Sequence, residues 1–412
     1  MAAVPDAPVT PPVTAADVRS ARELLSGVVR PTPIAGARAL SDLTGTSVHL
    51  KCENLQRTGS FKIRGAYTRI ARLTAAERAR GVVAASAGNH AQGVALAARL
   101  LGVRATVFMP ERAALPKVDA TRGYGAEVVL TGESVDDAVA AATASAADSG
   151  AVLVHPFDHP DVVAGQGTVG LEILEQVPDV GTVLVSAGGG GLLGGIAAVV
   201  REYRPRTRIV GVQAAGAAAW PSSLAAGRPM PLAGMRTMAD GIAVGRPGDV
   251  TFPQVAGLID EMVTVGEDAL SGALVHCLER AKMVVEPAGA APVAALLERP
   301  DRFAGPTVAV LSGGNVDPLV LLQVIRHGLV GSARYLTLHV QIQDRPGALA
   351  ELLARVGSLG ANVTDVAHSR ISGALAVGEV DVELSLETRG AEHRDAIVAG
   401  LREAGHAVPA PA

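Results

Sequence analysis

Short apolar runs rich in β-branched residues alternate with Ala-, Leu- and Arg-rich amphipathic segments along most of this chain. The expected strands include 82–85, 105–109, 127–130, 153–154, 182–186, 209–213 and 307–311. The expected helices include 91–101, 134–149, 165–177 and 192–202. Apolar strands separated by helices are typical of parallel sheets covered by helices. The pattern predicts an α/β body over residues 14–331, preceded by a flexible, Pro- and Ala-rich arm at 1–13.

The texture changes after residue 331. Residues 336–342 and 380–386 alternate apolar and polar side chains, as half-buried strands do. Asp344 is placed to cap a helix that ends near Gly360 and Asn362, and a second helix is expected at about 391–404. The order βαββαβ over residues 335–408 predicts a separate ferredoxin-like domain. Such a small unit is near the lower size limit for an independent core, so we expect it to pack against another copy or the main body.

Composition narrows the function classes. The chain of 412 residues has a net charge of −4 and few aromatic residues (one Trp, four Tyr and five Phe), which disfavours a nucleic-acid partner. Two unpaired cysteines, Cys52 and Cys277, and no secretory signal at the start indicate the cytoplasm. The uncharged run 180–200 is interrupted by four glycines, so we expect strand, loop and helix rather than a membrane span.

Lys62 is the lysine with the most suggestive surroundings. It follows the turn Thr58-Gly59-Ser60, with Phe61 beside it, and is expected at the start of a helix. The positive end of a helix lowers the pKa of an amine, and a deprotonated amine can attack an aldehyde. On spacing alone, a solvated surface lysine is the more ordinary explanation.

Three further segments follow expected strands. Gly188, Gly189, Gly190 and Gly191 precede Leu192 at an expected strand-to-helix turn, where free backbone N–H groups suit a monophosphate. Neither an acidic ribose partner nor a Walker lysine accompanies this loop, which disfavours a dinucleotide or ATP. The other two segments are Ser86-Ala87-Gly88-Asn89-His90-Ala91-Gln92-Gly93 and Ser312-Gly313-Gly314-Asn315, at the strand ends where α/β proteins bind ligands. Separately, each also fits an ordinary helix cap.

The FKIRGA segment around Lys62, the SAGNHAQG segment, the tetraglycine loop and the SGGN segment occur in this order. Together they closely resemble the threonine dehydratase (threonine ammonia-lyase) family of pyridoxal-phosphate enzymes over about residues 20–330. The resemblance implies fold type II, as in the tryptophan synthase β chain, with a small subdomain at about 50–150 inserted in a larger one. It also implies a homotetramer.

The same resemblance implies roles for individual residues. Lys62 would be the catalytic Schiff-base lysine, with Phe61 beside the cofactor. The residues 188–192 would hold the cofactor phosphate, Asn89 the ring 3-hydroxyl and Ser312 the ring nitrogen. Ser86, Asn89 and His90 would receive the substrate carboxylate. The segments 239–244 and 286–289 resemble family segments that line the site. No metal site is expected, because the segment 213–219 lacks a carboxylate.

The C-terminal unit resembles an ACT domain, an amino-acid-sensing module. The segment Asp344-Arg345-Pro346-Gly347-Ala348-Leu349 matches its first strand-to-helix turn. By this resemblance Gly347, Ala348, Leu349 and Asn362 would be regulatory residues. A domain that only stabilises an oligomer remains the alternative, since a fold does not fix a function.

The expected function is α,β-elimination of L-threonine to 2-oxobutanoate and ammonia, in isoleucine biosynthesis or threonine catabolism, with a branched-chain amino acid as effector. One alternative is an L-serine dehydratase or a related β-elimination or β-replacement enzyme. Another is a catalytically idle amino-acid sensor. Discrimination between threonine and serine depends on a methyl pocket, which residue order does not locate.

Overall fold

The computed structural model describes residues 13–370 and 375–408. It divides into two compact units, Met1–Leu321 and Leu322–Ala412, and the division falls within the helix α14 (Pro318–Gly331). Most of the predicted arm lies outside the described residues. Its last residue, Val13, is buried and exchanges two hydrogen bonds with Gln254, so the ordered body already includes this residue.

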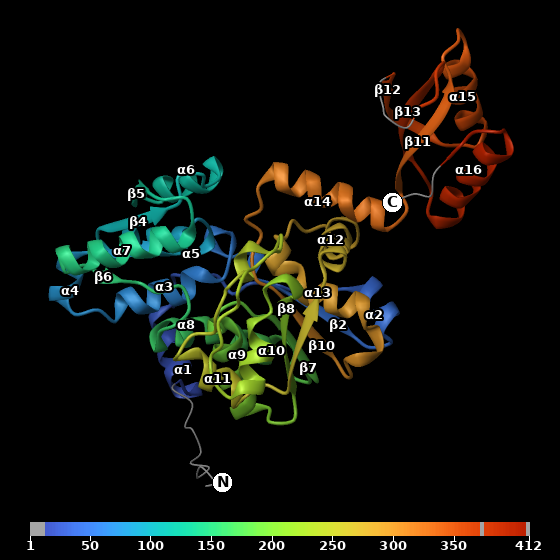
Figure 1. Cartoon of the computed structure of the whole chain (residues 1–412). Helices are drawn as coiled ribbons and strands as arrows, with labels where there is room; N and C mark the ends of the chain where they lie inside the picture. The colour runs from blue at the N-terminus through green and yellow to red at the C-terminus, as the bar shows by residue number, and fades with distance from the viewer. Residues whose placement is uncertain (1–12, 371–374, 409–412) are drawn as a thin grey trace, which may run out of the picture. The chain divides into compact units, whose positions relative to one another are not determined.

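The first unit contains two sheets (Figure 1). The larger sheet has the strand order β1-β2-β10-β7-β8-β9, with β1 antiparallel to β2 and every other neighbouring pair parallel. Its strands are β1 (Ile34–Gly36), β2 (Val48–Cys52), β7 (Thr182–Ser186), β8 (Arg208–Ala214), β9 (Glu261–Val265) and β10 (Thr307–Leu311). Parallel strands end at the same edge, so the segments after β7 and β10 are brought together there.

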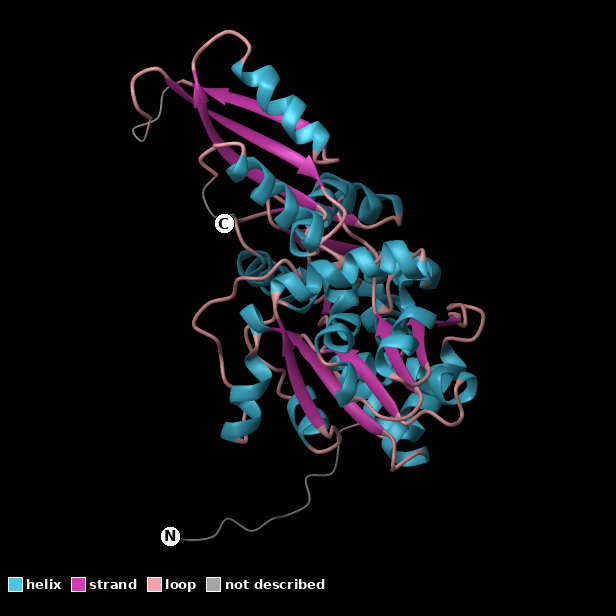
Figure 2. Cartoon of the chain, turned by 90° about the vertical axis from the view of Figure 1, so that its right-hand side faces the viewer, coloured by secondary structure: helices cyan, strands magenta, loops and turns pink. Residues whose placement is uncertain are grey.

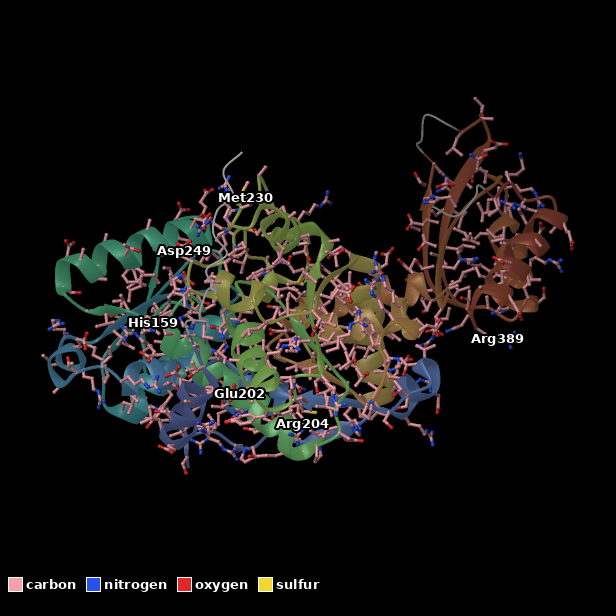
Figure 3. The ribbon with its side chains drawn as sticks, turned by 90° about the horizontal axis from the view of Figure 1, so that it is seen from below. His159, Glu202, Arg204, Met230, Asp249 and Arg389 are labelled. Carbon is pink, nitrogen blue, oxygen red and sulfur yellow. The ribbon has the colours of Figure 1, made fainter. Side chains whose placement is uncertain are left out.

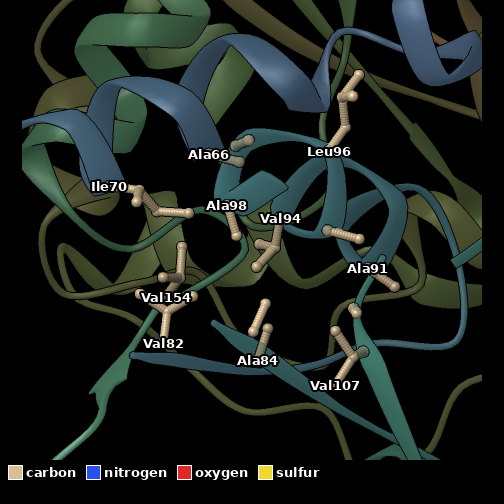
Figure 4. Close-up of a cluster of buried hydrophobic side chains, with 14 of the residues drawn as sticks. Ala66, Ile70, Val82, Ala84, Ala91, Val94, Leu96, Ala98, Val107 and Val154 are labelled. Carbon is tan, nitrogen blue, oxygen red and sulfur yellow. The ribbon is translucent and has the colours of Figure 1, made fainter. Parts of the chain in front are cut away.

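The smaller sheet is wholly parallel, in the order β5-β4-β3-β6. Its strands are β3 (Val82–Ala85), β4 (Ala105–Met109), β5 (Glu127–Leu130) and β6 (Val152–Leu153). All four come between β2 and β7 in the chain, so this sheet is an insertion in the larger one. Ile70, Val82, Val94 and Val107 belong to the apolar core that joins it to its helices (Figure 4).

Helices surround both sheets of the first unit. They are α1 (Ala15–Leu24), α2 (Arg38–Thr44), α3 (Lys62–Ala71), α4 (Ala75–Arg80), α5 (Asn89–Leu101), α6 (Leu115–Gly123), α7 (Val135–Ser149), α8 (Pro160–Gln176), α9 (Gly191–Tyr203), α10 (Ala219–Ala226), α11 (Thr251–Ala256), α12 (Glu267–His276) and α13 (Pro287–Glu298). Short 3-10 turns occur at η1 (Glu53–Leu55), η2 (Arg57–Gly59), η3 (Ala215–Ala217), η4 (Asp240–Ile242) and η6 (Pro300–Arg302), and a π-helical turn, η5, at Cys277–Ala281.

Local sequence signals explain several of these boundaries. Capping boxes begin α1, α4 and α7, where a Thr or Ser side chain and the acidic residue three positions later each bond the other's backbone N–H. The uncharged run 180–200 divides into β7, the glycine loop and α9. Among the described residues, no helix is both long enough and apolar enough to cross a membrane.

The second unit contains an antiparallel sheet in the order β11-β13-β12, with α15 and α16 on one face (Figure 1, Figure 2). Its elements are β11 (Tyr335–Gln343), α15 (Ala348–Ser358), β12 (Asn362–Ser369), β13 (Glu379–Glu387) and α16 (Ala391–Glu403). A single bridge between Gln341 and Ala407 stands where the last strand of the βαββαβ pattern was expected. The prediction that Asp344 caps the helix is wrong: α15 starts after Gly347, and Asp344 pairs with Arg370.

Candidate active site

Lys62 is the first residue of α3, as its sequence context predicts. The backbone N–H of Phe61 donates to the carbonyl of Ser312, after β10, at 3.2 Å. The Lys62 amine donates to the carbonyl of Pro156, after β6, at 2.9 Å. It also lies 5.1 Å from the centroid of the Phe61 ring. Lys62 is therefore held where segments from both sheets of the first unit meet.

Burial governs the chemistry of this lysine. Desolvation lowers the pKa of the Lys62 amine to about 8, while the nearby Glu286 carboxyl acts in the opposite direction. A lowered pKa increases the fraction of neutral, nucleophilic amine at physiological pH. The structure does not show the solvated surface lysine that was the alternative explanation.

The four glycines after β7 run past side chains that leave no room for a Cβ atom. A Cβ on Gly189 would enter the ring of Phe157. Gly190 has a left-handed backbone, with φ of +99°, and a Cβ there would lie 2.6 Å from Trp220. The Trp220 indole N–H donates to the carbonyl of Gly188 at 2.7 Å, and the Thr251 hydroxyl to that of Gly189 at 2.5 Å. Glycine is thus required here by packing as well as by conformation.

This loop fits a phosphate group. Its carbonyls are used by Trp220 and Thr251, whereas the N–H groups of Gly188, Gly189 and Gly190 donate to no partner in residues 13–370 and 375–408. Gly191 and Leu192 begin α9, where helix geometry leaves the first N–H groups unpaired. Unpaired N–H groups at the positive end of a 13-residue helix form a binding site for an anion.

Asn89 is fixed by two side chains from other parts of the first unit. Its amide oxygen accepts a hydrogen bond from Asn315 at 2.7 Å, and its amide nitrogen donates to Glu286 at 2.6 Å. Asn315 also donates to the carbonyl of Thr58 at 2.6 Å. Burial, followed by the proximity of Asp240, raises the pKa of Glu286 to about 7. Asn89, expected from sequence to bind the cofactor ring, is therefore rigidly oriented.

Ser312 lies close to the cluster formed by Asn89, Asn315 and Glu286. It is buried directly after β10, and its backbone carbonyl accepts from Phe61 beside Lys62. Its hydroxyl makes no hydrogen bond within the described part of the chain, so both its donor and its acceptor capacity are left for a ligand. A Cβ on the next residue, Gly313, would meet the Glu286 carboxyl at 2.2 Å.

Ser86 and His90 were expected to receive a substrate carboxylate, and both help to shape the loop before α5. The Ser86 hydroxyl accepts from the N–H of Gly88 at 3.2 Å. The His90 Nε2 atom lies 2.7 Å from the carbonyl of Val154, which only accepts, so Nε2 carries a proton. Burial and then Lys62 lower the pKa of His90 to about 3. His90 is therefore a neutral, buried ring that offers a carboxylate no positive charge.

Pro156 and Phe157 are site residues that the sequence did not reveal. The Pro156 carbonyl holds the Lys62 amine, and the Phe157 ring packs against the glycine loop. A backbone acceptor and a packing ring carry no residue-type signature, and no motif surrounds them.

The four residues expected to be regulatory, Gly347, Ala348, Leu349 and Asn362, lie in the second unit, at α15 and the start of β12. No cluster of His, Cys, Asp or Glu among the described residues has the arrangement of a metal site.

The geometry defines a class of protein: an α/β protein of two mainly parallel sheets, in which a desolvated lysine, a glycine loop with unpaired N–H groups and an oriented amide converge. The model of the family described as pyridoxal-phosphate dependent enzyme matches residues 25–313. The chain belongs to this family, and its first unit has the type II fold of pyridoxal-phosphate enzymes.

Individual relatives are more specific. An L-threonine ammonia-lyase of Geobacter sulfurreducens is 48% identical over 392 residues, covering 95% of this chain and 98% of the relative. One of Thermotoga maritima is 47% identical over 396 residues, covering 96% and 99%. Among solved structures, a threonine deaminase from T.th. is 42% identical with a TM-score of 0.71, covering 74% of this chain and 99% of its own.

Proposed function

We propose that this chain is a pyridoxal-phosphate-dependent threonine ammonia-lyase, which converts L-threonine to 2-oxobutanoate and ammonia. Two relatives of nearly the same length, at 47–48% identity, carry that name. The observation that carries the proposal is the desolvated Lys62 amine, bonded to Pro156 next to the Phe157 ring that packs on the glycine loop.

Each part of the cofactor has its own candidate partner in the site. The N–H groups of 188–192 would hold the phosphate, Lys62 the aldehyde carbon, Asn89 the ring 3-hydroxyl and Ser312 the ring nitrogen. Bound there, pyridoxal phosphate supplies an electron sink that acidifies the Cα–H of an amino acid. A Ser312 hydroxyl is a neutral partner and, unlike a carboxylate, does not hold the ring nitrogen protonated.

Lys62 also performs the proton transfer. Its amine takes the Cα proton of the substrate, which requires the neutral form that burial favours. The Pro156 carbonyl accepts one amine hydrogen and so orients the nitrogen lone pair. The β-hydroxyl then leaves as water, taking up one proton to balance the one that Lys62 removed from Cα. The released enamine tautomerises to an imine, which a water molecule hydrolyses to 2-oxobutanoate and ammonia.

The test is release of 2-oxoacid from L-threonine and L-serine by the purified protein and by Lys62→Ala. We expect threonine turnover in the parent, at least about 10²-fold less in the variant, and loss of the protein-bound cofactor absorbance. Lys282→Ala, at an exposed lysine whose amine donates only to the Glu279 carbonyl, is the matched control. Faster turnover of serine would favour the serine dehydratase, and turnover of neither would contradict the proposal.

We further propose that the second unit is an ACT-like domain that binds a branched-chain amino acid. A cavity of about 270 Å³ supports this. Asp344 and Arg370 line it and pair with each other, and a bound zwitterion would exchange that pairing for its own two charges. Leu349 and Ala348, but neither Gly347 nor Asn362, line it. The complete lining is Ile342, Gln343, Asp344, Arg345, Pro346, Ala348, Leu349, His368, Arg370 and Val380. Its apolar members suit a branched side chain.

The proposal includes a homotetramer in the cytoplasm. Light scattering of the purified enzyme tests the assembly, and four chains of 41.7 kDa are the expected mass. Cell fractionation tests the location.

A further inference from the structure

An ion pair joins the two sheet regions of the first unit beside the candidate active site. The amine of Lys117, in α6 of the smaller-sheet region, lies 2.9 Å from a carboxylate oxygen of Asp240 in η4. The same turn packs on the glycine loop, since a Cβ on Gly188 would lie 3.1 Å from the Cα of Ile242. None of the roles derived above uses this pair.

Lys117 also reaches the loop that was expected to receive the substrate carboxylate. Its amine lies 4.0 Å from the position that a Cβ on Gly88 would take. The ammonium group has three N–H donors, and its only recorded hydrogen bond among the described residues is the one to Asp240. Its side chain is 18% exposed, whereas that of Asp240 is 64% exposed.

A cation beside the Gly88 loop would favour the binding of an incoming carboxylate there. Lys117, Lys62 and Asp240 each act electrostatically on the buried Glu286 carboxyl. His90 is neutral, and Lys62 is committed to the cofactor. A substrate α-carboxylate placed at the Gly88 loop would face the Asp240 carboxylate, and Lys117 is the cation placed to neutralise it.

We propose that Lys117 binds the α-carboxylate of the amino-acid substrate and that Asp240 occupies the Lys117 amine until the substrate displaces it. This inference rests on the proposed function, because it presupposes an α-amino acid at this site. An ion pair with so exposed a carboxylate contributes little stability, so exchanging Asp240 for the substrate costs little.

The test compares Lys117→Gln and Asp240→Asn in the holoenzyme, which have opposite expected effects on the KM for L-threonine. Lys117→Gln removes a charge-assisted hydrogen bond to the substrate and raises KM about 10- to 100-fold, with kcat changed much less. Asp240→Asn removes a competitor and leaves KM equal or lower. Lys117→Arg keeps the charge and recovers most of the affinity.

Two matched control variants distinguish loss of the Lys117 contact from a general effect of charge on KM. Lys282→Gln makes the same charge change at an exposed lysine. Asp249→Asn does so at a surface carboxylate, labelled in Figure 3, that pairs with Arg246. Both should leave KM unchanged. In addition, the preference for L-threonine over L-threonine amide, which lacks the carboxylate, should collapse in Lys117→Gln alone.

If the Lys117–Asp240 pair has only a structural role, the expected results are different. If both variants raise KM, or if Lys117→Gln keeps the preference for L-threonine over its amide, the inference is wrong. If Lys117→Gln fails to fold, a raised KM in Asp240→Asn is sufficient to overturn it, and a KM that is equal or lower supports it. Calorimetric binding of L-threonine, which needs no turnover, distinguishes failure of this inference from failure of the proposed activity.

Discussion

Arg64 lies two residues after Lys62 and is fully buried with ionic partners on either side. Its guanidinium contacts Glu53 at 2.8 Å and Glu172 at 2.7 Å, and Glu172 also accepts from Lys51 at 2.5 Å. The four charges cancel, and the hydrogen bonds satisfy groups that burial would otherwise penalise. This network ties α3, and thus Lys62, to the end of β2 and to α8.

We expect Arg64→Ala to destabilise the protein by about 3–5 kcal/mol, because it leaves two buried carboxylates short of a partner. Arg22→Ala is the control: Arg22 pairs with Glu175 at the surface, where such pairs contribute about 0–1 kcal/mol. Urea unfolding measures the free energy of unfolding of both variants. Equal losses in the two variants would show that the buried network is no more important than the exposed pair.

From the raised pKa of Glu286 we expect the stability of the protein to depend on pH. The ordinary pKa of a glutamate is near 4.5, and burial raises that of Glu286 to about 7. Between these values the unfolded chain has lost the proton and the folded chain keeps it, so the free energy of unfolding falls as the pH rises through this window. Each unit of pKa difference corresponds to about 1.4 kcal/mol.

Glu286→Gln keeps an acceptor for Asn89 and removes the titration. In thermal unfolding of cofactor-free protein between pH 4.5 and 7.5, the variant should lose less stability with rising pH than the parent does. Parallel stability curves for the two proteins would mean that Glu286 is ionised in the folded state throughout this range.

At the scale of elements, a strand could be predicted from the sequence where its residues form an unbroken apolar run. β3, β4, β7 and β10 were expected because helices cover both of their faces. β2 was not among the strands named, since the polar Lys51 interrupts its apolar pattern and the partner of Lys51, Glu172, lies 121 residues away. Lys62 and the glycine loop were found through their motifs, whereas Pro156 acts through its backbone carbonyl, which any residue type would offer.

The glycine loop leaves little room for substitution. Gly190→Ala would force a side chain into a left-handed backbone and against the buried Trp220, costing at least about 2 kcal/mol. It should also weaken retention of pyridoxal phosphate, measured by dialysis and absorbance. Gly272→Ala, in α12 with open space around it, should be neutral or stabilising by about 0.5–1 kcal/mol. A Gly190→Ala protein that keeps both stability and cofactor would contradict this account of the loop.

At the scale of the whole molecule, catalysis and regulation are expected to separate. The matched family region ends at residue 313, and all groups of the candidate active site lie in the first unit. A chain truncated after residue 332 should therefore still release 2-oxobutanoate from threonine, yet lose its response to isoleucine and valine. Initial rates with and without these amino acids provide the measurement. A response that survives truncation would place the effector site in the first unit.

The strand order also has a consequence for biosynthesis. β10 lies between β2 and β7 in the larger sheet, although it is the last of its strands to leave the ribosome. Until residue 311 is made, β2 and β7 lack their shared neighbour and present unpaired edges, the kind of surface on which nascent chains aggregate. Ser312 follows immediately. Because the proposed cofactor contact at Ser312 is synthesised only then, we expect cofactor capture to come late in translation, and the exposed nascent strands to be where a chaperone would be needed.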